Sequence, residues 1–176
     1  DQGELSDPVW LDNGNIAALK KDKNRWQIVK FMPGAPDLVP LYSSNEKSYY
    51  HLIYSKDRKE LIALATNSSN EHVIDMISPK GELISSHVIE HSNIISPYQL
   101  IAPIIDPQVE QLLFSTGKRL FSLSFSGEIT HVSTLNYNYL SNIKMNKTGD
   151  NIVAVQGLID TDIAQINIEN IELNTE

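Results

Sequence analysis

The chain has 176 residues, 41% of them hydrophobic, and carries a formal net charge of −8 from 22 acidic and 14 basic residues. This length and composition indicate a globular domain with its own core and exclude an intrinsically disordered chain. The basic residues are scattered apart from KKDKNR at 20–25, which we interpret as a solvated turn, so direct contact with nucleic acid is not expected. The absence of cysteine excludes disulfides and thiolate metal sites.

The hydropathy and the start of the chain bear on its cellular location. No run approaches the ~18 consecutive apolar residues of a membrane helix, and no basic-then-apolar signal segment opens the sequence. The chain begins with Asp1 and not with methionine. We therefore expect a processed or excised piece of a longer protein, from which any signal or anchor has been removed.

In chain order, the first half of the sequence alternates apolar and polar residues with period two, which is typical of strands and not of helices. A first repeat predicts a turn at Gly34 and strands at 7–13, 13–21, 25–32 and 38–43. A second repeat predicts a turn at Gly81 and strands at 49–57, 58–66, 72–78 and 82–89.

The second half of the chain follows the same plan. A third repeat predicts a turn at Gly127 and strands at 98–106, 109–117, 119–125 and 128–135. A fourth predicts strands at 140–148, 149–157 and 161–169 and lacks a turn glycine. Gly34, Gly81 and Gly127 each stand where the chain turns into an outer strand, so we expect a positive φ at all three.

The second strands of the four repeats give the period of the sequence. Their first aliphatic residues follow one another at intervals of 45, 51 and 40 residues, and are Ile16, Leu61, Leu112 and Ile152. Four antiparallel strands repeated about every 40 to 50 residues are typical of β-propeller blades. The sequence therefore predicts an all-β, single-domain fold of about four four-stranded blades, with these aliphatic residues in equivalent buried places. The approximate blade boundaries are 7–48, 49–96, 97–141 and 142–176.

The stretch YSKDRKELIALA at 54–65 resembles the propeller repeats of the TolB type, whose phrase reads close to Ser-Pro-Asp-Gly-Lys-x-Leu-Ala-Phe. Ser55, Asp57 and Lys59 match this phrase, and Arg58 stands where glycine is usual. The segment MNKTGDNIVAV at 145–155 is similar to it as well. The resemblance implies a β-propeller, usually of about six to eight blades, so we expect this chain to be a fragment of a larger propeller.

The motif HVIEH at 87–91 is a candidate zinc site, because His-x-x-Glu-His is the pattern of one class of zinc peptidases. That pattern needs a helix, in which positions four apart share a face, whereas the residues before it are strand-like. On a strand, His87 and His91 would lie about 13 Å apart, so we predict no metal site. Neither a Gly-x-Ser-x-Gly elbow nor a glycine-rich phosphate loop occurs, so we predict a non-catalytic protein without a cofactor.

Six aromatic residues at predicted strand starts are candidates for an interaction rim on one side of the propeller, the usual recognition surface of the fold. They are Trp10, Trp26, Tyr49, Tyr50, Tyr54 and Tyr98. The alternative is that these large side chains fill the space between neighbouring blades. The sequence alone leaves both interpretations open.

The absence of a catalytic pattern, together with propeller-like repeats, favours a sensing or interaction module. The repeats resemble those of bacterial periplasmic proteins and of the extracytoplasmic parts of membrane-anchored winged-helix transcriptional regulators of the CadC and ToxR kind. The alternatives are the propeller portion of a hydrolase similar to the prolyl oligopeptidases, and a TolB-like periplasmic accessory protein. The signal or protein partner is not identified by the sequence. Exposed faces of the first and last blades are expected to cause self-association or low stability.

Overall fold

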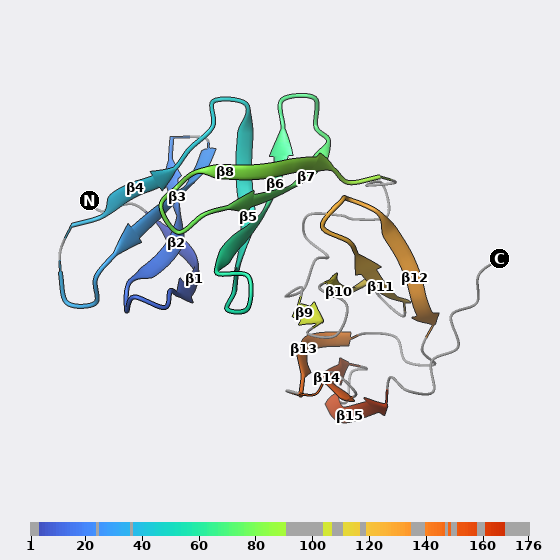
Figure 1. The fold of residues 1–176 in the computed structure, drawn as a ribbon. Coiled ribbons are helices and arrows are strands. Elements are labelled where there is room, and N and C mark those ends of the chain that lie inside the picture. Colours follow the sequence, from blue (N-terminus) through green and yellow to red (C-terminus); the bar gives the residue numbers. More distant parts are fainter. Residues whose placement is uncertain are drawn as a thin grey trace. The chain divides into compact units, whose positions relative to one another are not determined.

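A computed structural model describes residues 4–23, 25–35, 37–90, 104–106, 111–116, 119–134, 140–146, 148, 151–157 and 161–167. This part of the chain forms fifteen β-strands and no α-helix. The strands form antiparallel sheets, three of four strands and one of three (Figure 1). The predicted all-β class is thereby confirmed. The chain divides into two compact units, Asp1–Ile89 and Glu90–Glu176.

The first sheet of the first unit is built from the first repeat of the sequence. Its strands pair in the order β1 (Leu5–Trp10), β2 (Ile16–Asp22), β3 (Arg25–Phe31) and β4 (Val39–Tyr42). The second strand pairs with the third without interruption, from Ile16 opposite Phe31 to Asp22 opposite Arg25. The alternation of apolar and polar residues that predicted these strands gives each sheet face its own set of side chains.

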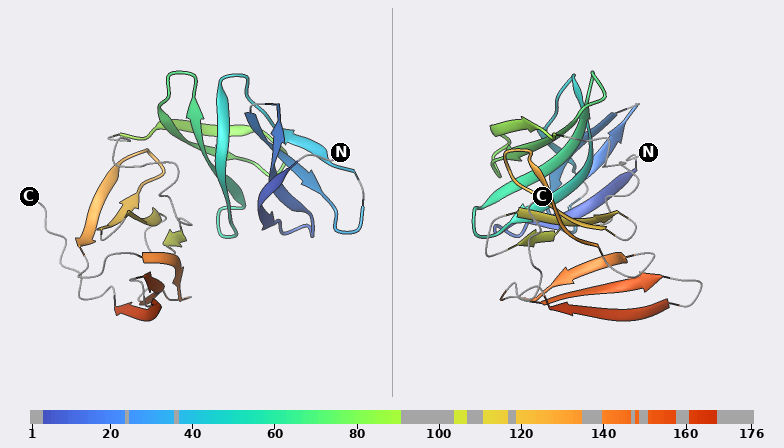
Figure 2. Two further views of the ribbon diagram at one scale, coloured as in Figure 1. Left: turned by 180° about the vertical axis from the view of Figure 1, so that it is seen from behind. Right: turned by 90° about the vertical axis from the view of Figure 1, so that its right-hand side faces the viewer.

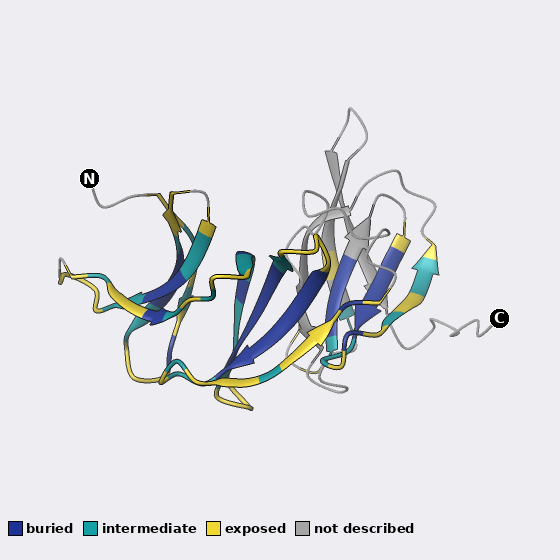
Figure 3. Cartoon of the chain, turned by 90° about the horizontal axis from the view of Figure 1, so that it is seen from above, coloured by how far each residue is buried: buried dark blue, intermediate teal, exposed yellow. Residues whose placement is uncertain are grey.

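The second sheet repeats this plan. Its strands pair in the order β5 (Lys47–Ser55), β6 (Glu60–Asn67), β7 (His72–Ile77) and β8 (Leu83–Val88). Buried residues concentrate on β6 and β7, whereas the outer strand β8 is mostly exposed (Figure 3). A strand buried on both faces is expected to be apolar throughout its buried part, as the buried run from Leu61 to Ala65 in β6 is.

The two sheets of the first unit enclose one hydrophobic core, here called the core cluster. The first sheet and the turn after β1 supply Leu11, Ala17, Leu19, Ile28 and Leu41. The second sheet supplies Tyr49, Leu52, Leu61, Ala63, Ala65, Val73 and Ile77. On β2 and β6 these residues are two positions apart, so each strand points one complete face at the other sheet.

The second unit contains the remaining sheets, which Figure 2 shows as twisted ribbons in two further views. One sheet contains β9 (Ile104–Asp106), β10 (Gln111–Thr116), β11 (Arg119–Leu123) and β12 (Ile129–Thr134). The other contains β13 (Leu140–Met145), β14 (Asn151–Gly157) and β15 (Thr161–Asn167). Phe114 and Phe121 stack on neighbouring strands of the first of these sheets, with ring centroids 5.5 Å apart.

Within each of the four sheets, the first aliphatic residue of the second strand is paired in the same way with the two neighbouring strands, as the spacing of the sequence predicted. Leu61 pairs with Tyr54 on one side and with Ile77 on the other, and Ile16, Leu112 and Ile152 each occupy the same ladder position in their own sheets. Leu61 and Leu112 are fully buried, as expected. Ile16 is only partly buried and does not belong to the core cluster. The side chain of Ile152 lies outside the described residues.

The recurring Gly-Glu phrase forms the same turn in both places. The backbone N–H of Gly81 donates to the carbonyl of Ser78 (2.9 Å), and that of Gly127 donates to Ser124 (3.0 Å). Both glycines have a positive φ, at 90° and 93°, and so does Gly34, at 83°. The predicted positive φ is confirmed at all three glycines.

The outer strand pairs differ from the central ones. Register shifts occur between β1 and β2, β3 and β4, β5 and β6, β7 and β8, β11 and β12, and β13 and β14. The second and third strands of every sheet pair without a shift. Irregularity is therefore confined to the first and last strands of the sheets.

Candidate functional site

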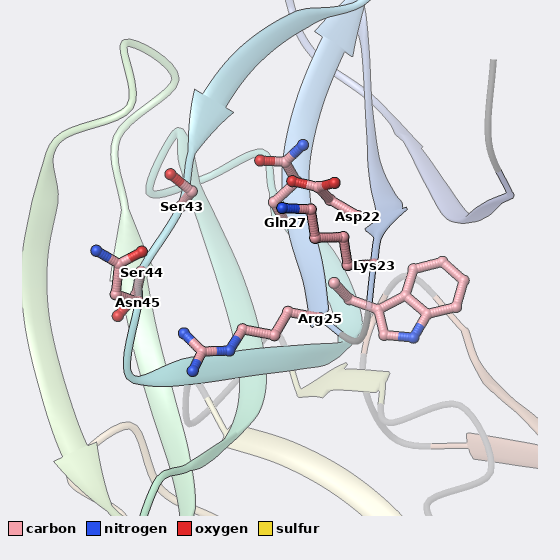
Figure 4. Close-up of a pocket in the computed structure, with 8 residues that line it drawn as sticks. Asp22, Lys23, Arg25, Gln27, Ser43, Ser44 and Asn45 are labelled. Atoms are coloured by element: carbon pink, nitrogen blue, oxygen red, sulfur yellow. The ribbon is translucent and has the colours of Figure 1, made fainter. Parts of the chain in front are cut away.

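A cavity of about 490 Å³ lies in the first unit, between the β2–β3 hairpin and the connection from β4 to β5. It is lined by Asp22, Lys23, Arg25, Trp26, Gln27, Ser43, Ser44 and Asn45 (Figure 4). The wall thus combines two cations and one carboxylate with side chains that donate or accept hydrogen bonds. We call this cavity the hairpin pocket.

The two cations of the hairpin pocket lie at the tip of the β2–β3 hairpin. Lys23 has a φ of 55° at the turn, and both Lys23 and Arg25 are exposed. Figure 4 shows the Arg25 side chain extending toward the segment that carries Ser44 and Asn45. The ammonium group of Lys21, by contrast, has partners within the first sheet. Its Nζ lies 3.6 Å from Oε2 of Glu4 and 5.8 Å from the ring centre of Trp26. Four residues of the stretch predicted to be a solvated turn are therefore exposed, namely Lys21, Asp22, Lys23 and Arg25. The last three of these border the hairpin pocket.

The hairpin pocket suits a ligand that carries a negative charge and further polar groups. Lys23 and Arg25 form no ion pair with any described carboxylate, and the guanidinium group of arginine can bind a carboxylate through two parallel hydrogen bonds. Gln27 and Asn45 offer amide groups that both donate and accept. The sequence pattern did not predict this pocket, because it depends on a connection about twenty residues further along the chain.

The predicted aromatic rim is divided between two ends of the sheets. In the first sheet, Trp10 pairs with Ile16 at one end of β2, and Trp26 pairs with Lys21 near the other end. In the second sheet, Tyr54 and Tyr49 are likewise at opposite ends of β5. The reason is that neighbouring strands are antiparallel, so two residues that both lie at the start of a strand can be at opposite ends of the sheet.

Burial separates these aromatic residues further. Tyr49 belongs to the core cluster and is not available to a partner, and Trp26 and Tyr54 pack against that cluster, which is the packing alternative left open by the sequence. Trp10 is 60% exposed, and Tyr50 is partly buried. Tyr98 lies outside the described residues. Among the five aromatic residues of this set that the structure describes, only Trp26 borders the hairpin pocket.

A buried polar network holds Tyr49 in place. The carboxylate of Asp75 is fully buried and accepts hydrogen bonds from Nζ of Lys47 at 2.8 and 2.9 Å and from the Tyr49 hydroxyl at 2.7 Å. Lys47 also donates to Oγ of Ser86 (2.8 Å). Burial and the negative charge of Asp75 raise the pKa of Tyr49. Because each group has a partner, this network stabilises the sheet and offers no reactive group.

A second polar contact lies on the neighbouring residue of β5. The hydroxyl of Tyr50 is hydrogen-bonded to Nδ1 of His72 at 2.9 Å, and the two rings meet edge to face with centroids 5.6 Å apart. Burial raises the pKa of Tyr50 and lowers the pKa of His72. His72 is therefore expected to be neutral near pH 7.

The motif HVIEH does not form a helix where the structure describes it. His87 is an exposed residue of β8, where it pairs with Ile74, and His91 lies outside the described residues. No group of three potential metal ligands occurs among the residues that the structure describes. Within the same residues, no helix is long and apolar enough to cross a membrane.

Comparisons with known proteins identify relatives in structure only. No protein-family model and no curated protein matches the chain. TolB from Acinetobacter baumannii is similar with a TM-score of 0.68 at 13% identity, over 97% of this chain and 42% of that one. Puromycin hydrolase is similar with a TM-score of 0.63 at 14% identity, over 97% of this chain and 30% of that one.

An extracellular domain assigned to the one component system BT4673 of B. thetaiotaomicron is also similar, with a TM-score of 0.55 at 13% identity, over 92% of this chain and 21% of that one. The chain thus spans less than half the length of each of these three solved chains. At such low identity the likeness concerns the fold alone. The repeated antiparallel sheets and these neighbours together show that the chain has a TolB-like β-propeller fold.

Proposed function

We propose that this chain is a non-catalytic sensing or interaction module, the extracytoplasmic part of a membrane-anchored winged-helix transcriptional regulator of the CadC and ToxR kind. The hairpin pocket is the observation that carries this proposal, because it collects charged and polar side chains, and no group of three potential metal ligands occurs among the described residues. The structural likeness to an extracellular domain of a one component system supports it.

In this proposal the signal is a small anionic ligand or an acidic segment of a partner protein. Lys23 and Arg25 supply the charge, and Gln27 and Asn45 supply hydrogen bonds. Binding at this place would contact a hairpin of the first sheet and the connection into the second sheet. A ligand could therefore stabilise both sheets together, which is the kind of change a sensor can transmit.

The pocket is tested by nuclear magnetic resonance titration of the chain with citrate, glucuronate and a glutamate-rich peptide, and with glucose as an uncharged control. We expect anionic probes to shift the signals of Ser44, Asn45 and the Trp26 indole, and Arg25→Gln to abolish the shifts. Lys80→Gln removes one positive charge from an exposed turn between β7 and β8 and is the matched control. Equal responses of both variants, or no response to any anionic probe, would contradict the pocket as the recognition site.

Two other functions share the fold. The likeness to puromycin hydrolase favours the propeller portion of a hydrolase, and the likeness to TolB favours a periplasmic accessory protein. The complete reading frame distinguishes them. An upstream winged helix followed by an apolar segment supports the regulator, a downstream domain with Gly-x-Ser-x-Gly supports the hydrolase, and a signal peptide without a further domain supports the accessory protein.

A further inference from the structure

The turn between β1 and β2, at residues 11–15, holds an asparagine directly before a glycine. The backbone N–H of Gly14 donates to the carbonyl of Leu11 (3.1 Å), and the N–H of Leu11 donates to the carbonyl of Asn15 (2.9 Å). Asn13 and Gly14 are both exposed. The dipeptide Asn-Gly occurs once in the sequence, at this turn.

Three further turns have the same two backbone hydrogen bonds, at residues 67–71, 78–82 and 124–128. In each of them the side chain of the first residue accepts a hydrogen bond from the backbone N–H of the fifth. The pairs are Asn67 with Glu71 (2.9 Å), Ser78 with Glu82 (3.1 Å) and Ser124 with Glu128 (3.0 Å). The side-chain oxygen at the first position thus satisfies a donor that the turn itself leaves free.

The β1–β2 turn satisfies this donor in another way, because its first residue, Leu11, has no side-chain acceptor. The backbone N–H of Asn15 donates instead to Oδ1 of Asn13 (3.1 Å). The side-chain amide of Asn13 is therefore folded back toward the backbone that follows it. Its carbon Cγ is held beside the peptide unit to which the nitrogen of Gly14 belongs.

This arrangement favours a reaction between the amide and the backbone. A backbone nitrogen that has lost its proton to solvent can add to Cγ of the asparagine before it. Negative charge then develops on Oδ1, where the N–H of Asn15 already donates, so this hydrogen bond stabilises the charge. The hydrogen bond from Gly14 to Leu11 has to open first. Opening is easy because no described atom lies within 4 Å of the place where a Cβ of Gly14 would stand.

We propose that Asn13 is a site of spontaneous deamidation, in which the chain supplies the nucleophile and water is the co-reactant. The nitrogen of Gly14 forms a bond to Cγ of Asn13, and the side-chain nitrogen leaves as ammonia. Water then opens the resulting succinimide ring at one of its two carbonyl groups. One opening gives aspartate. The other gives isoaspartate, in which the backbone runs through the former side chain and is longer by one carbon.

The modification acts on a turn that connects the two sheets of the first unit. Leu11 belongs to the core cluster. Asp12 accepts a hydrogen bond from the Tyr54 hydroxyl of β5, and burial together with this carboxylate raises the pKa of Tyr54. Because the backbone hydrogen bonds fix the length of the turn, an isoaspartate at position 13 weakens both contacts. Aspartate at the same position only adds a charge next to Asp12.

The first test ranks the asparagines of the chain. The 176-residue protein is incubated in mildly alkaline buffer, digested and analysed by mass spectrometry for replacement of a side-chain NH2 group by OH. Asn67 is the internal control, because its Oδ1 accepts a hydrogen bond from the N–H of Ser69 (3.0 Å) but the next residue is serine. We expect Asn13 to convert at least about tenfold faster than Asn67, since glycine has no Cβ to crowd its nitrogen. Equal rates, or no conversion of Asn13, would overturn the proposal.

The second test places a side chain beside the attacking nitrogen without disturbing the turn. Asn70 has a φ of 61° at the equivalent place in the turn at 67–71, so Gly14→Asn should preserve the fold and the melting temperature. It should slow the conversion of Asn13 by about tenfold or more. Gly34→Asn makes the same change at a glycine with a φ of 83° and open space, and should leave the rate at Asn13 unchanged. A folded Gly14→Asn protein that converts as fast as the parent would contradict the proposed reaction.

The third test measures the effect on the contact between the sheets. The modified protein carries one more negative charge and is separated from the parent by ion exchange, and enzymatic methylation identifies the isoaspartate form. Asn13→Asp is the matched control, since it adds the same charge to a backbone of normal length. We expect the isoaspartate form to melt at a clearly lower temperature than Asn13→Asp. Equal melting temperatures would overturn the predicted weakening of the two contacts.

Discussion

Gly81 is required by two independent conditions. Its φ of 90° lies in the region that side chains disfavour, and a Cβ atom added there would overlap the backbone carbonyl of Leu41 in the first sheet. Gly34 has a similar φ of 83° but open space around it. The two positions therefore separate the cost of the backbone conformation from the cost of the close approach.

We expect Gly34→Ala to lower the free energy of unfolding by about 1 kcal/mol, the usual cost of a left-handed residue with a Cβ atom. Gly81→Ala should cost at least about 2 kcal/mol more, because the two sheets must also move apart. Denaturant titration of both variants measures the difference. Similar stabilities would mean that Leu41 does not approach Gly81 as described.

Lys47 protects the stability of the second sheet by neutralising a buried carboxylate. Lys47→Met should lower the free energy of unfolding by about 3 to 5 kcal/mol, because it leaves Asp75 buried without its cation. The double variant Lys47→Met with Asp75→Asn should be less destabilised than Lys47→Met alone, since no buried charge remains. Thermal and denaturant unfolding of the three proteins would show this order, and a double variant that is the least stable would contradict it.

His72 should make stability depend on pH in a mildly acidic range. Burial lowers its pKa below the ordinary value of 6.5, so the unfolded chain binds a proton more readily than the folded one. The free energy of unfolding therefore falls as pH decreases below about 6.5, until the folded state is protonated as well. His72→Gln should flatten this part of the stability profile. An unchanged slope between pH 7 and pH 5 would show that His72 does not contribute.

Among single residues, the sequence predicted the turn glycines but not the buried network of Lys47, Tyr49 and Asp75. A glycine after a strand and before an outer strand is a local signal, so the positive φ at Gly81 and Gly127 could be predicted. Asp75 and Lys47 are 28 residues apart, and only the pairing of separate strands brings them together. The available hint was a carboxylate, Asp75, among the apolar residues Val73, Ile74, Met76 and Ile77 of β7.

Among the elements, the second strand of each sheet is the part that the sequence describes best. The recurrence of a short aliphatic run after a polar turn predicted the four strands β2, β6, β10 and β14 in the correct order and register. Which end of a sheet each aromatic ring would occupy was not predicted, since this depends on strand direction. The hairpin pocket likewise requires the β4–β5 connection to return past β3.

The equivalent positions in these strands should differ in their contribution to stability. Leu61→Ala and Leu112→Ala should each lower the free energy of unfolding by about 2 to 5 kcal/mol, because both side chains are fully buried. Ile16→Ala should cost clearly less in this chain, since Ile16 is partly exposed. Denaturant unfolding checks the order, and a Leu61→Ala variant as stable as the parent would show that the alignment of the repeats is wrong.

On the scale of the whole molecule, the period of the sequence was enough to predict a propeller fold. A repeat of four strands can bury its two sheet faces only against neighbouring repeats, so the period implies the side-by-side sheets seen in the first unit. The function does not follow in the same way. Related folds include a hydrolase and an extracellular domain, and only the side chains around a site distinguish such roles.

The confinement of register shifts to the outer strands has a consequence for how the protein folds. The uninterrupted central hairpins, such as β6 and β7, join residues close in the chain and combine them with the most complete burial. Local contacts of this kind form early and open last. Amide hydrogen exchange should therefore be slowest in β6 and β7 and faster in β5 and β8. The outer strands would then dock onto preformed hairpins, so that changes of length or alignment there delay the final step of folding without preventing its start.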